Sequence, residues 1–171
     1  MAAHLEAVEV APVEAIVRFA KRLPVFPCRR TSETILMPDG REKLLKAKSP
    51  YTTHGFRDAS QDPEQIRAWW KRWPDAYVGV PTGIGTGFIA IDYDPPKATD
   101  AARAWIEQHS NELMSARIHH TLNGGHHYLF HIANDQLFRS GTDITLDGVV
   151  RKGIDLRAEC GYIIWWPLHG A

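Results

Sequence analysis

The stretch from Gly87 to Pro95 restricts the fold of this chain more than any other segment. Residues 88–91 are apolar or small and predict a buried strand, which ends on Asp92 and Asp94. Side chains two residues apart on a strand share one face, so the two carboxylates should leave the strand end together. Such close like charges repel unless a cation lies between them, and carboxylate oxygens suit Mg²⁺ or Mn²⁺. The alternative is an acidic turn, because Asp is common where strands end.

The chain has 171 residues and an ordinary globular composition, enough for one domain built of two small lobes. We expect a single domain over residues 1–171 that divides near residue 85, with residues 1–10 as a flexible lead-in. No apolar run reaches membrane-spanning length and the N-terminus lacks a signal-peptide pattern, so we expect a cytoplasmic protein without a membrane partner. Two distant cysteines, Cys28 and Cys160, predict free thiols rather than a zinc site.

The segment 29–50 is the basic part of a chain whose formal net charge is zero. Any binding of nucleic acid must therefore use a local patch of this kind. Its basic residues are Arg29, Arg30, Arg41, Lys43, Lys46 and Lys48, against the acidic Glu33, Asp39 and Glu42. A Pro-Asp-Gly turn at 38–40 predicts a hairpin. Such a run is most often a solvated loop, but beside a site that binds phosphate groups its basic side chains would help to hold them.

Helices and strands intermix with hairpin-like turns, which predicts an α+β fold rather than a doubly wound sheet. Apolar spacing predicts helices over 12–22, 62–73 and 99–109. The tryptophans of the second helix occupy one face and are expected in the core rather than on a base-stacking surface. A glycine-rich turn at 81–87 lacks the Gly-Lys-Ser/Thr of a Walker A loop. Further strands are predicted over 23–27, 77–80, 116–121, 126–132, 153–157 and 162–166.

Two more residues are candidates for the same site as the aspartate pair. Asp155 lies between apolar residues on a predicted strand, where an unpaired carboxylate is costly. It either pairs with Arg157 on the same face or completes a metal site with Asp92 and Asp94. His127 follows a glycine pair that lets backbone and ligand come close, although a structural histidine is the alternative. If the acids repel one another without metal, replacing one should leave stability unchanged or raise it.

In order and spacing, these motifs resemble the bifunctional DNA primase/polymerase domain, a branch of the archaeo-eukaryotic primase superfamily found in plasmid, phage and mobile-element replication proteins. That family carries a D-x-D/E motif at a strand end, a small-x-His motif, and a hydrophobic-Asp motif on a later strand. Here the three motifs correspond to residues 92–94, 121–127 and 153–157. The first helix, the Lys-Ser-Pro element at 48–50 and the tryptophan helix extend the similarity over about residues 12–167.

The resemblance implies an α/β unit packed on an RRM-like unit, with the active-site cleft between them. It implies two divalent ions, Mg²⁺ or Mn²⁺, held by three metal ligands: Asp92, Asp94 and Asp155. His127 would contact the phosphates of the incoming nucleotide. The basic residues expected to bind nucleotide or DNA are Lys48, Arg157, Arg29 and Arg30.

The implied activity is DNA primase/polymerase chemistry, in which a primer 3′-hydroxyl attacks the α-phosphorus of a nucleoside triphosphate. The partners would be a DNA template with its primer and the nucleoside triphosphates. Relatives often continue into a helical accessory domain and a helicase, so such a partner is expected in the same or another chain. The chain departs from the family at 165–168, where Trp-Trp-Pro-Leu replaces a Pro-Pro-Ser-like stretch, and it lacks the cysteines of a zinc-binding stem.

Two other functions remain open from the sequence. One is a catalytically silent module that binds nucleotide or DNA on the same fold, which the intact acids disfavour. The other is a metal-dependent replication-initiator nuclease, which needs two histidines with one residue between them. His127 and His131 are four residues apart, and His119 and His120 are adjacent, so neither pair has that spacing.

Overall fold

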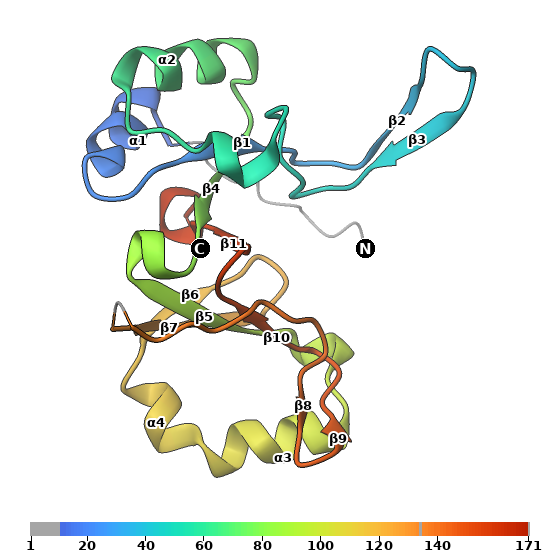
Figure 1. Ribbon diagram of the computed structural model, residues 1–171, viewed down its shortest axis with the longest axis vertical. Coiled ribbons are helices and arrows are strands. Elements are labelled where there is room, and N and C mark those ends of the chain that lie inside the picture. The colour runs from blue at the N-terminus through green and yellow to red at the C-terminus, as the bar shows by residue number, and fades with distance from the viewer. Residues whose placement is uncertain (1–10, 134, 171) are drawn as a thin grey trace, which may run out of the picture.

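The computed structural model describes residues 11–133 and 135–170, so the lead-in predicted over 1–10 lies outside the described residues. The fold is mixed α+β, as predicted, and is built around two antiparallel sheets (Figure 1). None of the described helices is long and apolar enough to cross a membrane. Both cysteines are free thiols, as predicted, with Cys28 buried and Cys160 exposed.

The first sheet has the strand order β1-β4-β11. Its strands are β1 (Phe26–Cys28), β4 (Tyr77–Pro81) and β11 (Tyr162–Ile164). Helices α1 (Val13–Ala20) and α2 (Pro63–Arg72) pack on it through their apolar faces. Helix α2 starts as predicted, because the Asp62 side chain accepts a hydrogen bond from the Glu64 amide. The strand predicted over 23–27 begins only at Phe26, since Val25 forms an isolated bridge to Ser60 instead.

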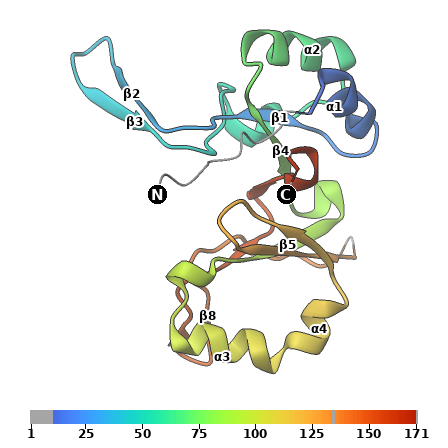
Figure 2. The ribbon, with the colours of Figure 1, turned by 180° about the vertical axis from the view of Figure 1, so that it is seen from behind.

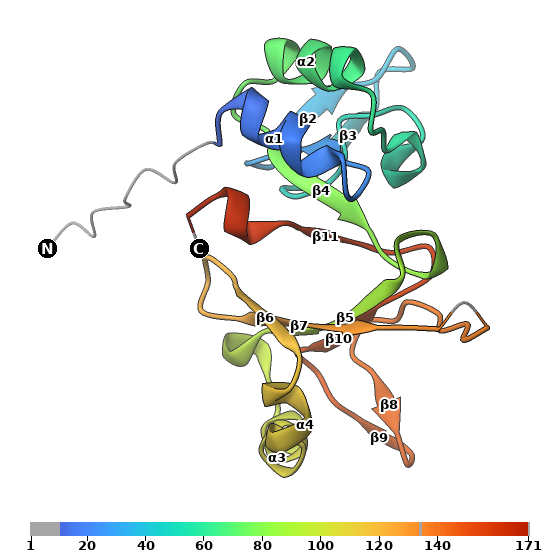
Figure 3. The same cartoon turned by 90° about the vertical axis from the view of Figure 1, so that its left-hand side faces the viewer.

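The second sheet has the strand order β10-β5-β7-β6, and every neighbouring pair is antiparallel. Its strands are β10 (Ile154–Arg157), β5 (Phe88–Tyr93), β7 (His126–His131) and β6 (Arg117–His120). Helices α3 (Asp100–Gln108) and α4 (Ser110–Met114) lie along one face of this sheet, and the first sheet lies on the opposite side (Figure 3). Ala102 of α3 packs against Ile154 of β10 on the helix-covered face.

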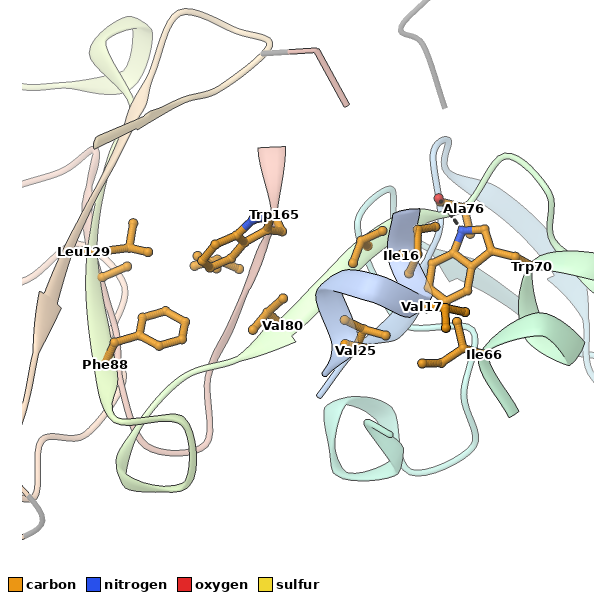
Figure 4. Packing of buried hydrophobic residues seen from close by; sticks show 14 residues of the cluster. Ile16, Val17, Val25, Ile66, Trp70, Ala76, Val80, Phe88, Leu129 and Trp165 are labelled. Atoms are coloured by element: carbon orange, nitrogen blue, oxygen red, sulfur yellow. Dashed lines mark hydrogen bonds between the residues drawn. The ribbon is translucent and has the colours of Figure 1, made fainter. Parts of the chain in front are cut away.

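Trp165 connects the cores of the two sheets. Its ring lies 4.8 Å from the ring of Phe19 and 6.1 Å from that of Phe88, measured between centroids. Figure 4 shows it between Val80 of the first sheet and Leu129 of the second. The last strand was predicted to reach residue 166, but it ends at Ile164. A 3₁₀ turn over Trp166–Leu168 follows, because the proline at 167 cannot donate to a strand ladder.

The tryptophan face of α2 is core, as predicted. Ile66 and Trp70 are buried, and Trp69 and Trp73 pack against the same cluster while remaining partly exposed. Trp73 also stacks on Tyr51 with ring centroids 4.7 Å apart. These tryptophans therefore help to hold together the first unit, by which we mean the first sheet with α1 and α2.

Two hairpins extend from the sheets. The one predicted in the basic segment consists of β2 (Glu33–Leu36) and β3 (Glu42–Leu45), and it projects away from the body of the molecule (Figure 2). The second consists of β8 (Thr145–Leu146) and β9 (Val149–Val150), in the segment before β10. Short 3₁₀ turns at Gly55–Asp58, Ile84–Thr86 and Pro95–Lys97 complete the described elements.

Candidate active site

A row of polar side chains crosses all four strands of the second sheet. The register pairs Asp155 of β10 with Asp92 of β5, Asp92 with His127 of β7, and His127 with His119 of β6. Directly paired residues on antiparallel strands point to the same face and lie close together. Strand β5 ends at Tyr93, so Asp92 lies within the ladder and Asp94 directly follows it, in agreement with a strand predicted to end on these two residues. Three strands thus bring the predicted residues of the three motifs together.

The row faces the first sheet rather than the helices. Asp92 has the same parity on β5 as Ala90 and Phe88, which pack into the core that the two sheets share. His127 is 5% exposed and His119 only 3%. At the Asp155 end the row opens into a cavity of about 590 Å³, a size typical of small-molecule sites. The predicted residues that line it are Asp92, Asp94, His127, Asp155, Lys48 and Arg157.

Arg157 lies between two of the predicted metal ligands. Its Nη2 lies 2.6 Å from Asp155 Oδ2 and 3.3 Å from Asp92 Oδ2. The pairing with Asp155 was one of the two explanations left open by the sequence, and it is present. The three side chains are 22% to 31% exposed, so water screens this pair only in part. The guanidinium therefore supplies the positive charge that two facing carboxylates require.

His127 contacts the other oxygen of Asp92. Its Nε2 lies 3.4 Å from Asp92 Oδ1, and its Nδ1 is buried without a hydrogen-bond partner in the described part of the chain. Burial alone raises the pKa of Asp92, but His127 and the Arg157 guanidinium outweigh burial and lower the pKa below its usual value. Asp92 is therefore ionised at neutral pH, as a metal ligand must be.

Asp94 is held by a different cation. Lys97, three residues along in the 3₁₀ turn, forms an ion pair with Asp94, and this contact raises the pKa of the lysine. Lys97 is 77% exposed on its side chain, so the pair is screened and easily exchanged. The two acids of the D-x-D motif are thus paired with different cations, Asp92 with Arg157 and Asp94 with Lys97.

Two glycines allow the strand ends of the site to approach closely. A Cβ at Gly125, before β7, would lie 2.5 Å from the Tyr93 carbonyl oxygen. Gly153, before β10, has φ +86° and accepts a hydrogen bond from the Asp94 amide at 2.8 Å. The glycine pair was expected to let backbone and ligand come close, and Gly125 lets the backbone of β5 approach. These glycines therefore keep the three motif segments in register.

The donor atoms fit a divalent cation in their chemistry. The three aspartates supply hard carboxylate oxygens to one cavity, which is the ligand type that Mg²⁺ and Mn²⁺ prefer. In the conformation described for residues 11–133 and 135–170, however, no group of three such side chains is close enough to hold an ion. Arg157 occupies the space between Asp92 and Asp155, and Asp94 is turned to Lys97. A bound ion would have to replace these cations.

Arg29 and Arg30, which were expected near nucleotide or DNA, do not line this cavity. The Arg29 guanidinium pairs with Glu33, donates to the Pro50 carbonyl and lies over the Tyr51 ring. Arg30 lies over the ring of Tyr77. Both arginines therefore stabilise the first unit and the root of the hairpin. Lys48 of the same segment does line the cavity, with its Nζ 5.2 Å from the Trp166 ring centroid.

Several cavity residues had not been singled out from the sequence. They include Lys97, Asp143, Tyr162 and Trp166. The Asp143 amide donates to Asp155 Oδ1 at 2.8 Å, and the Tyr162 hydroxyl donates to the Lys48 carbonyl at 3.2 Å. The spacing of Lys97 from Asp94 was a usable signal. The others lie outside the motifs and gave none.

The sequence matches a family model described as bifunctional DNA primase/polymerase, N-terminal, over residues 16–170. The match spans nearly the whole chain and includes all three motif segments of the polar row. No curated protein matches the sequence.

Proposed function

Because the chain belongs to the bifunctional DNA primase/polymerase N-terminal family, we propose that its polar row is the centre of template-directed nucleotidyl transfer. The family implies primase/polymerase activity in general. The observation that carries the proposal for this site is the register of Asp155, Asp92 and His127 on three adjacent strands. A purely structural sheet has no need of two carboxylates and a histidine side by side in its buried face.

The three aspartates are the proposed ligands of two divalent ions, Mg²⁺ or Mn²⁺. When bound, such ions lower the pKa of an attacking hydroxyl and neutralise the charge of a triphosphate. The protein's own contribution is to keep Asp92 ionised and to hold Asp155 in place. The Asp143 amide does the latter through its 2.8 Å hydrogen bond. These contacts fix the ligand oxygens before substrate arrives, which is how positioning lowers a barrier.

The cations of the site are the proposed ligands of the triphosphate. His127 has a buried ring nitrogen without a hydrogen-bond partner in the described part of the chain, and Arg157 and Lys48 line the same cavity. Hydrogen bonds from these groups would strengthen as charge develops on the phosphate oxygens. The reaction joins the primer 3′-oxygen to the α-phosphorus, and pyrophosphate leaves with the bonding electrons.

The wider organisation is proposed on the same basis. The strand order β10-β5-β7-β6, with α3 and α4 on one face, supports an RRM-like unit packed on the α/β unit of the first sheet. We regard the two units as one catalytic domain dividing near residue 85. DNA template, primer and nucleoside triphosphates are its proposed partners, with a helicase or helical accessory domain beside it. Replication of a plasmid, phage or mobile element in the cytoplasm is the proposed setting.

One observation favours a second candidate, a nucleotide- or DNA-binding module without turnover. Every proposed metal ligand is already ion-paired to Arg157 or Lys97. If these pairs persisted with substrate bound, the site would bind phosphate through its cations but assemble no metal centre. The two functions therefore differ in whether metal is needed.

Two measurements on one set of proteins test the proposal. Calorimetry measures dNTP binding with and without Mn²⁺, and extension of a labelled primer measures turnover. We compare wild type with Asp92→Asn, and use Asp147→Asn in the exposed β8–β9 turn as a matched control. Metal-dependent binding and extension, both lost only in Asp92→Asn, support the polymerase. Metal-independent dNTP binding without extension in any protein would establish the silent module instead.

A further inference from the structure

Asp143 lies at the candidate active site, although none of the three sequence motifs includes it. It lines the cavity together with Asp94, Asp155 and Gly153. Its backbone has φ +48°, in the left-handed region that aspartate and asparagine enter more readily than other residues with a side chain. Such a conformation persists only where surrounding contacts hold it, and in Asp143 those contacts lead to the proposed metal ligands.

The segment before β8 forms an additional edge along β10, the strand that carries Asp155. Gly141 exchanges two backbone hydrogen bonds with Leu156, at 2.9 and 2.8 Å. Further along, the Ile144 amide donates to the Ile154 carbonyl at 2.9 Å. Between these two contacts the edge has two residues and β10 has only one, Asp155. Two residues opposite one are the pattern of a β-bulge, which leaves one residue out of the strand ladder.

Asp143 is in this bulge, and it is tied to two of the proposed ligands. Its amide, turned out of the ladder, donates to Asp155 Oδ1 at 2.8 Å. Its own Oδ1 accepts a hydrogen bond from the Gly153 amide at 3.0 Å. The Gly153 carbonyl in turn accepts one from the Asp94 amide at 2.8 Å. One residue thus connects the side chain of Asp155 to the backbone of the D-x-D motif.

The Asp143 contact also distinguishes the two oxygens of Asp155. Oδ1 is held by the Asp143 amide, while Oδ2 lies 2.6 Å from Arg157 Nη2. A backbone amide is fixed by the fold, whereas the Arg157 side chain is 31% exposed and can turn away. The amide therefore keeps the carboxylate in one orientation while the partner of Oδ2 is exchanged.

We propose that Asp143 is a positioning residue for the metal centre, which orients Asp155 and fixes its place relative to Asp94. Its backbone amide makes the contact. Its side chain maintains that contact by tolerating the left-handed conformation and by accepting from Gly153. Hydrogen-bond partners of this kind orient the carboxylates that bind a metal. This inference rests on the proposed function, because that function supplies the divalent ion.

Calorimetric binding of Mn²⁺, without DNA or dNTP, tests this role apart from turnover. Asp143→Ala removes the acceptor and disfavours the positive φ, whereas Asp143→Gly keeps the φ and removes only the acceptor. Asp143→Asn keeps both and removes the charge. Asp147→Ala is the matched control, because Asp147 has φ +51° in the β8–β9 turn, away from the residues that line the cavity. Asp92→Asn identifies the Mn²⁺ that binds at the site, and thermal unfolding in EDTA shows that each variant is folded during the titration.

We expect Asp143→Ala and Asp143→Gly to bind Mn²⁺ about tenfold more weakly than wild type, which is the scale of losing such a partner of a metal ligand. Asp143→Asn should bind Mn²⁺ nearly as wild type does, because Asp143 is exposed and its charge is screened. Asp147→Ala should match wild type in Mn²⁺ affinity even if the loss of a left-handed aspartate lowers its melting temperature.

Three results would contradict the inference. Equal Mn²⁺ affinity in Asp143→Ala and wild type, with affinity lost in Asp92→Asn, would overturn the positioning role and leave the proposed function intact. A loss in Asp143→Asn as large as in Asp143→Ala would also overturn it, because the Asp143 carboxylate would then be a metal ligand itself. No Mn²⁺ binding in wild type, or binding unchanged in Asp92→Asn, would overturn the proposed function and the inference with it.

Discussion

Replacing Arg157 by Met tests whether the aspartates form a cation site, because it removes the guanidinium and keeps an unbranched apolar side chain. Asp92 and Asp155 would then face each other across adjacent strands with no cation between them. Losing one partner of a fully buried pair costs about 3–5 kcal/mol, and of an exposed pair about 0–1 kcal/mol. With 22% to 31% of each side chain exposed, the loss should be about 2 kcal/mol.

For a chain of this size, that loss corresponds to a melting temperature lower by about 4–8 °C at pH 7 in EDTA. Divalent ions should reverse it, because the two freed carboxylates attract a cation and no guanidinium has to be displaced. Mn²⁺ at one hundred times its dissociation constant stabilises a protein by about 2.7 kcal/mol. The rise in melting temperature on adding Mn²⁺ should therefore be larger in Arg157→Met than in wild type at equal concentration.

Thermal unfolding in EDTA and in a Mn²⁺ series provides the assay, with Arg139→Met on the exposed segment before β10 as control. The control should unfold and respond to Mn²⁺ as wild type does. The reasoning is refuted if Arg157→Met and wild type have the same melting temperature in EDTA. It is also refuted if Mn²⁺ stabilises both proteins equally, because the aspartates would then not be competing for a cation.

Three further outcomes follow from the contacts of the site and the core. Asp155→Ala should lower the melting temperature in EDTA by removing the nearest partner of Arg157, and a rise would restore the view that the acids repel each other. His127→Ala should weaken calorimetric dNTP binding about tenfold by removing a charge-assisted hydrogen bond, and unchanged affinity would exclude that contact. Buried His169 accepts a hydrogen bond from the Val78 amide, and burial lowers its pKa to about 4. Because this pKa is depressed in the folded protein, folding is favoured while His169 is neutral in both states, and this contribution to the free energy of unfolding is fully present above about pH 6.5. His169 should account for about 3 kcal/mol of the stability lost as pH falls toward 4, so the loss should be smaller by that amount in His169→Gln. The same pH dependence of stability in wild type and His169→Gln would contradict the assignment.

The polar row of the second sheet was largely accessible from the sequence. Alternation on short strands identifies which side chains share a face, and the tight turn at 123–125 fixes how β6 pairs with β7. The same register also determines the place of His119 beside His127, although no chemical motif drew attention to it. Local periodicity was therefore sufficient to predict which side chains lie together where the paired strands, such as β6 and β7, follow each other in one hairpin.

The sequence did not show in the same way which cation neutralises Asp92 and Asp155 together. The sequence suggested that Asp92 and Asp155 repel each other without metal, whereas Arg157 bridges them in the structure. That bridge depends on the pairing of β10 with β5, strands separated by more than fifty residues, and no local pattern encodes it. The position of Arg29 and Arg30 outside the cavity was inaccessible for a related reason, because their aromatic partners, Tyr51 and Tyr77, are brought to them by the fold.

Single-nucleotide incorporation on four templates, differing only in the base after the primer end, tests the central claim most directly. Wild type with Mn²⁺ or Mg²⁺ should add the complementary nucleotide in each case, and Asp92→Asn should add none while Asp147→Asn matches wild type. Addition that ignores the template base, or that survives in Asp92→Asn, would contradict template-directed transfer at the polar row.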